Sequence, residues 1–230
     1  MSDIILPTKK SPATRKNPKT LILYGKPKVG KTTILKELDN CLIIDLEDGS
    51  DFVEALKYKV NNLKELHDLG EKIKEQGKPY KYIAIDTITK LEEWCEEAAT
   101  TSYKKKPIGK NFTGKTVLEL PKGAGYLHLR IAYKTWISYI ETLADNLIFV
   151  GHVKDSVIDK SGTEVTVSDV DLTGKLKAIT CQNADAIGYI YRKEDKPFVS
   201  FKHNGELEAG GRCEHLIDQE FEFDWSKIYV

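Results

Sequence analysis

The amino-acid sequence predicts an α/β fold with a largely parallel central sheet flanked by helices. Short apolar runs, each about the length of a buried strand, alternate with segments of helical periodicity over most of the 230 residues. Apolar residues make up 40% of the chain, which is enough for a substantial core in a domain of this length. Both observations favour one domain of generous size that carries short arms.

Strand and helix patterns alternate from residue 20 to residue 100. Helical spacing of apolar residues occurs at 31–39, 62–77 and 88–100, and the second of these helices is predicted to stop at a glycine. Apolar runs of strand length precede the helices, at 20–25 (TLILYG), 41–46 (CLIIDL) and 80–86 (YKYIAID). Each predicted strand is thus followed by a predicted helix, as expected for a parallel sheet.

The rhythm breaks at residues 101–122, where two glycines and two prolines predict a flexible loop rich in lysine. Beyond this loop the sequence predicts, in order, a long helix at 124–145, a strand at 146–152, a polar loop with a small hairpin at 153–172, a short helix at 173–182, and late strands at 185–193 and 197–203.

Composition changes at both ends predict three parts: a basic, poorly ordered N-terminal arm (1–19), a core of alternating strands and helices (20–216) and a charged, aromatic C-terminal tail (217–230). The first 20 residues contain five basic side chains and one acidic side chain, a net charge of +4. A solvated tail and a DNA-binding arm both fit this composition.

Whole-chain composition argues against nucleic-acid binding driven by overall charge, a closed zinc site and a membrane span. The formal net charge is zero, so any attraction to nucleic acid must come from local patches. The four cysteines form no CxxC pair, and Cys213 with His215 offers too few ligands for a closed zinc site, so we expect a reducing cytoplasm. We find no signal peptide and no apolar run near the roughly 20 residues of a membrane span, and expect no membrane partner.

Two segments match the phosphate-loop (P-loop) pattern of a glycine, four residues and then Gly-Lys-Thr: residues 25–32 (GKPKVGKT) and 109–116 (GKNFTGKT). The first follows a buried strand and precedes a helix, the context in which backbone N–H groups face a phosphate. The second follows SYKKKPI, and Pro121 falls where its helix should continue. We therefore expect one nucleotide site, formed by Gly25, Lys28, Val29, Gly30, Lys31, Thr32 and Thr33.

Each part of such a site has a chemical task. Lys31 reaches the β- and γ-phosphates, and the Thr32 hydroxyl ligates Mg²⁺. Asp86 closes the strand YIAID and presents a second oxygen to the metal, as a Walker B carboxylate does. Thr87 follows it, so the base for hydrolysis must come from elsewhere. Glu47 ends the strand after the P-loop helix, where ligands of α/β sheets bind, and is our candidate base; a solvated loop carboxylate is the alternative.

The P-loop, Asp45-Leu46-Glu47 and Asp86-Thr87 together resemble the RecA-like ATPase core over roughly residues 20–215. The resemblance implies ATP and Mg²⁺ as cofactors, Glu47 as catalytic glutamate, and His152 as the residue that senses the γ-phosphate. Glutamine occupies that last position in RecA, so the sensor role of His152 stays open beside a purely structural one. The small phage ATPases of single-strand annealing and recombination resemble the chain most closely, because they too have only this core.

The resemblance also implies that subunits complete one another's sites. Arg212, on a glycine-rich turn after a late strand, is our candidate for an arginine donated across an interface, and an ordinary surface arginine is the alternative. We expect a homo-oligomer, either a ring or a filament.

Single-stranded DNA is the expected partner, and the lysine-rich segment 101–125 is its expected site. This segment carries a net charge of +5, with Tyr103, Phe112 and Tyr126 interleaved for base stacking. A solvated loop is the alternative. Residues 153–175, the second candidate loop, carry a net charge of −2 and are not assigned to DNA. The predicted DNA contacts are Lys104, Lys105, Lys106, Lys110 and Lys115.

The sequence and this resemblance thus predict a cytoplasmic, phage-encoded ATPase that DNA stimulates and that promotes annealing or recombination. Two other functions remain open at this stage. One is a P-loop nucleotide or small-molecule kinase, although segment 101–125 lacks the arginines of a phosphate lid. The other is a DNA-binding module in which ATP acts only as an assembly switch.

Overall fold

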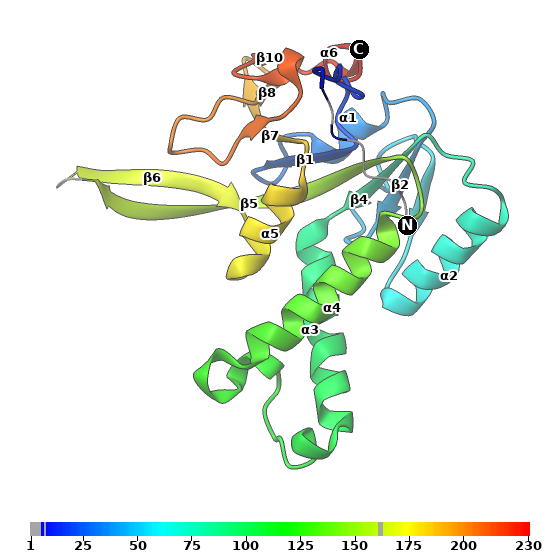
Figure 1. Ribbon diagram of the computed structural model, residues 1–230, viewed down its shortest axis with the longest axis vertical. Coiled ribbons are helices and arrows are strands. Elements are labelled where there is room, and N and C mark those ends of the chain that lie inside the picture. The colour runs from blue at the N-terminus through cyan, green and yellow to red at the C-terminus, as the bar shows by residue number, and fades with distance from the viewer. Residues whose placement is uncertain (1–5, 7, 161–162) are drawn as a thin grey trace.

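A sheet of ten strands organises the chain in the computed structural model, which describes residue 6, residues 8–160 and residues 163–230 (Figure 1). Six neighbouring strands run parallel, and four more are added antiparallel at the sides. The parallel strands, in spatial order, are β3 (Lys57–Lys59), β2 (Cys41–Asp45), β4 (Tyr82–Asp86), β5 (Asn146–Lys160), β1 (Thr20–Gly25) and β7 (Ala186–Lys193). The antiparallel strands are β6 (Thr163–Val170), β8 (Lys196–Ser200), β9 (Gly210–Gly211) and β10 (Glu220–Glu222).

Helices cover both faces of this sheet, so the predicted fold class is confirmed. On one face lie α2 (Leu63–Glu75), α3 (Ile88–Lys105), α4 (Gly125–Ile140) and α5 (Lys175–Asn183). On the other lie α1 (Lys31–Leu35) and α6 (Trp225–Ile228). Short 3-10 turns complete the secondary structure: η1 (Pro107–Gly109), η2 (Val117–Glu119), η3 (Pro121–Gly123) and η4 (Glu214–Leu216).

Alternation along the central strands explains the two apolar cores. On β1, Ile22 and Tyr24 face the helices α2 to α5, while Leu21 and Leu23 face α1 and α6, and all four side chains are fully buried. A strand that is buried on both faces reads as a continuous apolar run, which is why these strands could be predicted from sequence.

The segment after α3 differs from the predicted flexible loop. Helix α3 continues to Lys105 instead of ending at residue 100, and residues 107–123 form three 3-10 turns. Tyr103, Val117 and Leu120 form a small core of their own there, separate from the sheet. With α4 these turns build a helical arm that extends away from the sheet, and we call residues 88–140 the α3–α4 arm (Figure 1).

Residues 153–172 also differ from the polar loop that we predicted. Strand β5 runs on to Lys160 and pairs with β6 in a long antiparallel hairpin that projects from the sheet (Figure 1). This segment has a period-2 pattern, since Val165 and Val167 are half-buried while Glu164 and Thr166 are exposed. The many charged residues of the segment obscure this pattern in the sequence. Residues 161–162, part of the predicted loop, lie outside the described residues.

The carboxyl-terminal residues pack on the sheet. Strand β10 pairs with β8, and the Trp225 indole on α6 donates a hydrogen bond of 2.7 Å to the carbonyl of Ile34 on α1. Asn17 exchanges two hydrogen bonds with the backbone of Val230, at 2.9 and 3.0 Å. Most of the predicted N-terminal arm is exposed where it is described, and residues 1–5 and 7 lie outside the described part. Over the described ranges, no helix combines the length and apolar character that a membrane crossing requires.

Candidate nucleotide site

The P-loop of residues 25–32 joins β1 to α1 at the carboxyl end of the parallel strands. Gly25 is pressed against β7, where a Cβ would lie 2.3 Å from the carbonyl oxygen of Ile190. Gly30 has a φ of 100°, a conformation that residues with a Cβ avoid. Both glycines are therefore required by the turn that the loop makes.

Lys31 begins α1 and folds its side chain back over the loop. Its Nζ donates hydrogen bonds of 2.9 Å to the carbonyl oxygens of Gly25 and Lys26, and only 7% of the residue is exposed. Burial lowers the pKa of the ammonium, although Asp86 and Glu47 oppose this shift. A buried cation at the centre of the loop is suited to an anionic ligand such as a phosphate.

A cavity of about 360 Å³ opens beside the loop. The strands β1, β4 and β2 end at this cavity, and β5, which lies between β1 and β4, passes it at His152. Among the predicted nucleotide-binding residues, the side chain of Val29 instead packs toward the core beside α1, so it can offer only its backbone. The cavity is lined by Pro27, Lys28, Gly30, Lys31, Thr32, Thr33, Asp45, Glu47, Gly49, Phe52, Val53, Asp86, Thr87 and His152.

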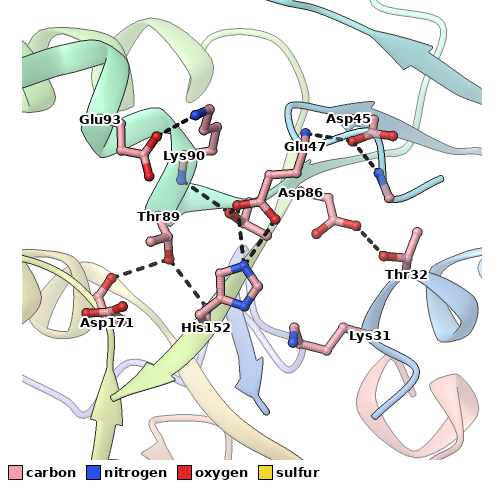
Figure 2. A network of polar contacts seen from close by, with 12 residues as sticks. Lys31, Thr32, Asp45, Glu47, Asp86, Thr89, Lys90, Glu93, His152 and Asp171 are labelled. Atoms are coloured by element: carbon pink, nitrogen blue, oxygen red, sulfur yellow. Dashed lines mark hydrogen bonds and ion pairs between the residues drawn. The ribbon is translucent and has the colours of Figure 1, made fainter. Parts of the chain in front are cut away.

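Thr32 and Asp86 meet in this cavity. The Thr32 hydroxyl donates a hydrogen bond of 2.6 Å to Oδ2 of Asp86 (Figure 2). Burial, with the nearby carboxylates of Asp45 and Glu47, raises the pKa of Asp86 to about 6. A hydroxyl and one carboxylate fit Mg²⁺, which keeps few protein ligands and takes the rest from water and phosphate. Among the described residues, no cluster of three or more His, Cys, Asp or Glu side chains that could hold a metal ion occurs.

Glu47 lies across the cavity and is held by two neighbours (Figure 2). Oε1 accepts a 2.7 Å hydrogen bond from the Thr87 hydroxyl, and Oε2 lies 3.0 Å from Nε2 of His152. Burial opposes ionisation of Glu47, but the contacts with His152 and Thr87 outweigh it and lower the pKa of the carboxyl. The hydrogen bond to Glu47 in turn raises the pKa of His152. Glu47 is therefore an oriented carboxylate, ionised at neutral pH.

Asp45 holds the loop that carries Glu47. Its carboxylate accepts hydrogen bonds from the amides of Glu47 at 2.9 Å and Ser50 at 2.8 Å, and from the Ser50 hydroxyl at 2.6 Å. Burial opposes its ionisation, but these hydrogen bonds prevail and lower its pKa. Asp45 thus fixes the turn that carries Glu47 away from the end of β2.

A family model described as an AAA domain matches residues 17–213, most of the chain and all of this cavity. The chain belongs to the AAA domain family. It is accordingly a P-loop ATPase domain, and the predicted α/β fold with a largely parallel central sheet flanked by helices is confirmed. No curated protein matches this AAA domain by sequence.

Solved structures similar to this AAA domain include three proteins of low sequence identity. An ATPase from the type III secretion system of pathogenic bacteria is 10% identical, with a TM-score of 0.46 over 84% of this chain and 65% of its own. The RadB recombinase is 12% identical, with a TM-score of 0.45 and coverage of 92% and 90%. A KaiC-like protein from the hyperthermophilic archaeon Pyrococcus horikoshii OT3 is 14% identical, with a TM-score of 0.45 and coverage of 91% and 87%.

The second P-loop match in the AAA domain has a different setting. Residues 109–116 follow helix α3 and η1 rather than a strand. Gly109 packs under the end of α3, where a Cβ would lie 2.0 Å from the carbonyl oxygen of Tyr103, and Thr116 and Glu119 cap the turn η2. The loop geometry that frames Lys31 does not occur around Lys115.

The remaining predicted residues lie away from the cavity. Arg212 follows β9 at the amino end of the sheet, where its guanidinium donates to the carbonyl of Gln182 at 2.6 Å and lies 3.7 Å from Asp185. Lys104, Lys105, Lys106, Lys110 and Lys115 lie at the far end of the α3–α4 arm.

Thr87 and Phe52 are among the cavity residues that sequence reasoning missed. Thr87 was noted only as the residue that replaces a glutamate, yet its hydroxyl positions Glu47 and also accepts from the amide of Lys90 to cap α3. Phe52 lines the cavity mouth with its side chain almost fully exposed, and an isolated aromatic residue in a polar loop carries no periodic signal.

Proposed function

We propose that this AAA domain hydrolyses ATP with Mg²⁺, and that it does so under the control of single-stranded DNA. The observation that carries the proposal is that Lys31, the Thr32–Asp86 pair and Glu47 line one cavity at the carboxyl ends of β1, β4 and β2. Phosphoryl transfer needs little more than such positioning and charge, because most of its barrier is lowered electrostatically.

In the proposed reaction, Lys31 holds the β- and γ-phosphates together with the backbone N–H groups of the loop. Thr32 and Asp86 hold Mg²⁺, which supplies positive charge to the phosphate oxygens when it is bound. Glu47 orients a water molecule toward the γ-phosphate and accepts its proton. Thr87 and His152 keep the Glu47 carboxylate in one orientation, and His152 also responds to the γ-phosphate.

DNA is proposed to bind at the end of the α3–α4 arm. Lys104, Lys105 and Lys106 are exposed there, and Nζ of Lys104 lies 5.7 Å from the ring centroid of Phe112. Exposed lysines beside aromatic rings suit the backbone and bases of a single strand. Helix α3 begins beside the residue that holds Glu47 and ends at these lysines, so one rigid element joins the two sites.

Annealing or recombination of DNA is the proposed biological task, carried out by a homo-oligomer that is a ring or a filament. A phage origin and a cytoplasmic location belong to the same proposal. Its support is the resemblance of the core motifs to the small phage annealing ATPases, together with the lysine-bearing arm.

The decisive experiment measures phosphate release from ATP with and without single- and double-stranded DNA. Release that single-stranded DNA stimulates, and that Lys31→Ala abolishes, supports the proposal. Release that DNA does not alter, together with transfer of phosphate to a small molecule, favours a kinase. Tight ATP binding with negligible release favours an ATP-controlled DNA-binding switch.

A further inference from the structure

Arg192 is an exposed cation beside the P-loop that the proposed reaction does not use. It lies on β7, which pairs in parallel with β1 so that Ile190 is opposite Gly25, the first residue of the loop. Arg192 therefore lies two residues beyond the point where β1 ends. Ile190 belongs to the core that α1 covers, and residues two apart on a strand share a face, so Arg192 lies on the side of α1.

The distance to the loop agrees with this register. Nη1 of Arg192 lies 3.8 Å from the position that a Cβ on Gly30 would occupy. Gly30 immediately precedes Lys31, and the backbone here forms the cradle for the phosphates nearest the nucleoside. Glu47, Asp86 and His152 line the cavity where the γ-phosphate is expected, whereas Arg192 lies outside that lining, beside the loop backbone at Gly30.

The hairpin that follows Arg192 holds it in place. Glu194 and Asp195 both have positive φ, at 51° and 62°, and form the two-residue turn between β7 and β8. Nη2 of Arg192 donates to the carbonyl of Asp195 in this turn. Within the described ranges, no carboxylate lies within ion-pair distance of its guanidinium.

Three cations gather around this point. Lys28 and Lys31 lie on the same loop, and the guanidinium of Arg192 is fixed next to Gly30. Like charges at close range repel unless an anion lies between them. A guanidinium with free donors is well matched to phosphate oxygens.

We infer that Arg192 binds the α- or β-phosphate of the nucleotide held by its own subunit. The inference rests on the proposed ATP site and adds a residue that acts on ADP and ATP alike. Arg192 thus contributes to holding the nucleotide before and after hydrolysis. It has no part in orienting the attacking water, which lies on the Glu47 side.

The test compares the wild type with Arg192→Ala and with Lys193→Ala, the adjacent exposed cation on the opposite face of β7. Equilibrium binding is measured with a fluorescent N-methylanthraniloyl ADP and with unlabelled ADP, ATP and adenosine as competitors. We expect Arg192→Ala to raise the Kd for ADP and ATP equally, by about tenfold or more, as for loss of one charge-assisted hydrogen bond. Adenosine binding and the Lys193→Ala variant should be unchanged.

The outcomes separate this inference from the proposed function. If the wild type binds nucleotide and Arg192→Ala binds it equally well, the inference is wrong and the ATP site stands. A loss confined to ATP would also overturn it, because the contact would then be to the γ-phosphate. If the wild type binds neither nucleotide, the ATP site itself fails. Thermal unfolding without nucleotide shows that the variant is folded, and Arg192→Lys should recover part of the affinity.

Discussion

The role proposed for Glu47 depends on its immediate neighbours. Without the Thr87 hydroxyl and the His152 ring, it would be one of several carboxylates on the loop after β2. These two contacts favour its ionised form and fix the direction of its oxygens. At the residue scale, chemistry here depends on orientation more than on an unusual pKa.

Replacing Glu47 by Gln should therefore stop hydrolysis and leave ATP binding in place. We expect kcat to fall by about 10²- to 10⁴-fold, the usual contribution of general base catalysis, with little change in Kd for ATP. Steady-state phosphate release and equilibrium binding measure the two quantities. Asp48→Asn is the matched control, since Asp48 lies on the same loop but pairs with Lys59 at the surface. Equal losses in both variants would count against Glu47.

Asp86 and Asp45 are buried carboxylates whose pKa values are shifted in opposite directions. Replacing each by asparagine should therefore have opposite effects on the stability of the protein. The folded-state pKa of Asp86 is raised, so its stabilising contribution is complete below an unfolded value of 3.8 and is lost as pH rises through about 6. Asp86→Asn should thus stabilise the nucleotide-free protein at pH 7 by up to about 3 kcal/mol, while abolishing Mg²⁺-dependent hydrolysis. The gain should vanish near pH 3.

Asp45→Asn provides the contrast. The folded-state pKa of Asp45 is lowered, so its contribution is present above 3.8 and is lost as pH falls through the folded value. This variant should therefore destabilise the protein at pH 7. The two substitutions, Asp86→Asn and Asp45→Asn, should thus change the free energy of unfolding in opposite directions. Urea unfolding of both variants across pH 3 to 8 measures the effect. Destabilisation by both at pH 7 would contradict the reasoning for Asp86.

At the scale of elements, helix α3 is the feature with the widest reach. It starts at the nucleotide cavity with Thr87 as its cap and ends under the lysines of the arm. A shift of Thr87 on ATP binding would move a rigid body of 18 residues. This is the route by which the two proposed sites can affect one another.

Neutralising Lys104, Lys105 and Lys106 together should weaken single-stranded DNA binding and flatten its dependence on salt. Each lost phosphate contact reduces the slope of log K against log salt by about 0.7 for single strands. Fluorescence anisotropy from 50 to 300 mM salt measures the slope. The control replaces three exposed lysines elsewhere, Lys36, Lys78 and Lys227. An unchanged slope in the arm variant would place the DNA on another surface.

Elements differ in how well the sequence predicts them. The parallel strands other than β3, and the P-loop, were predictable, because continuous apolar runs are a strong signal and the loop needs its glycines for local reasons. Strand β3 was missed, because its three residues are exposed and form no apolar run. The β5–β6 hairpin was not, because charged residues mask its alternation. The turns of the α3–α4 arm were not either, since Val117 and Leu120 are buried by the distant Tyr103, a contact without sequence periodicity.

The candidate site was predictable in its residues but not in its contacts. Asp45, Glu47 and Asp86 could be placed together because parallel strands end at one edge. The pairing of Glu47 with His152 depends on β5 lying between β1 and β4, an order that the sequence leaves undetermined. The proximity of Arg192 to Gly30 depends on the same sheet order and on one strand register.

On the scale of the whole molecule, Arg212 and the P-loop lie at opposite ends of the sheet. Strand β1 separates them, and its six residues span roughly 20 Å. Arg212 is therefore out of reach of the phosphates of its own subunit. Arg212 could therefore act only on a nucleotide that is bound by a neighbouring subunit in a head-to-tail assembly.

Mixing two inactive variants tests this arrangement. Subunits with Arg212→Ala keep an intact cavity, and subunits with Lys31→Ala keep the arginine, so mixed oligomers should regain part of the ATPase activity. Phosphate release measured against the mixing ratio should peak near equal amounts. Activity in Arg212→Ala alone that matches the wild type, or an absence of recovery on mixing, would leave Arg212 as a surface residue held by Asp185.

The hydrogen bond from Trp225 to Ile34 makes the nucleotide site vulnerable to damage far away in sequence. Helix α1 has only five residues, and the indole occupies the carbonyl of one of them from 191 positions downstream. Proteolytic cleavage before Trp225 would remove this hydrogen bond and expose the apolar residues of α1 that α6 covers. Such cleavage would then lower the affinity for ATP, although it removes none of the side chains that are proposed to bind phosphate.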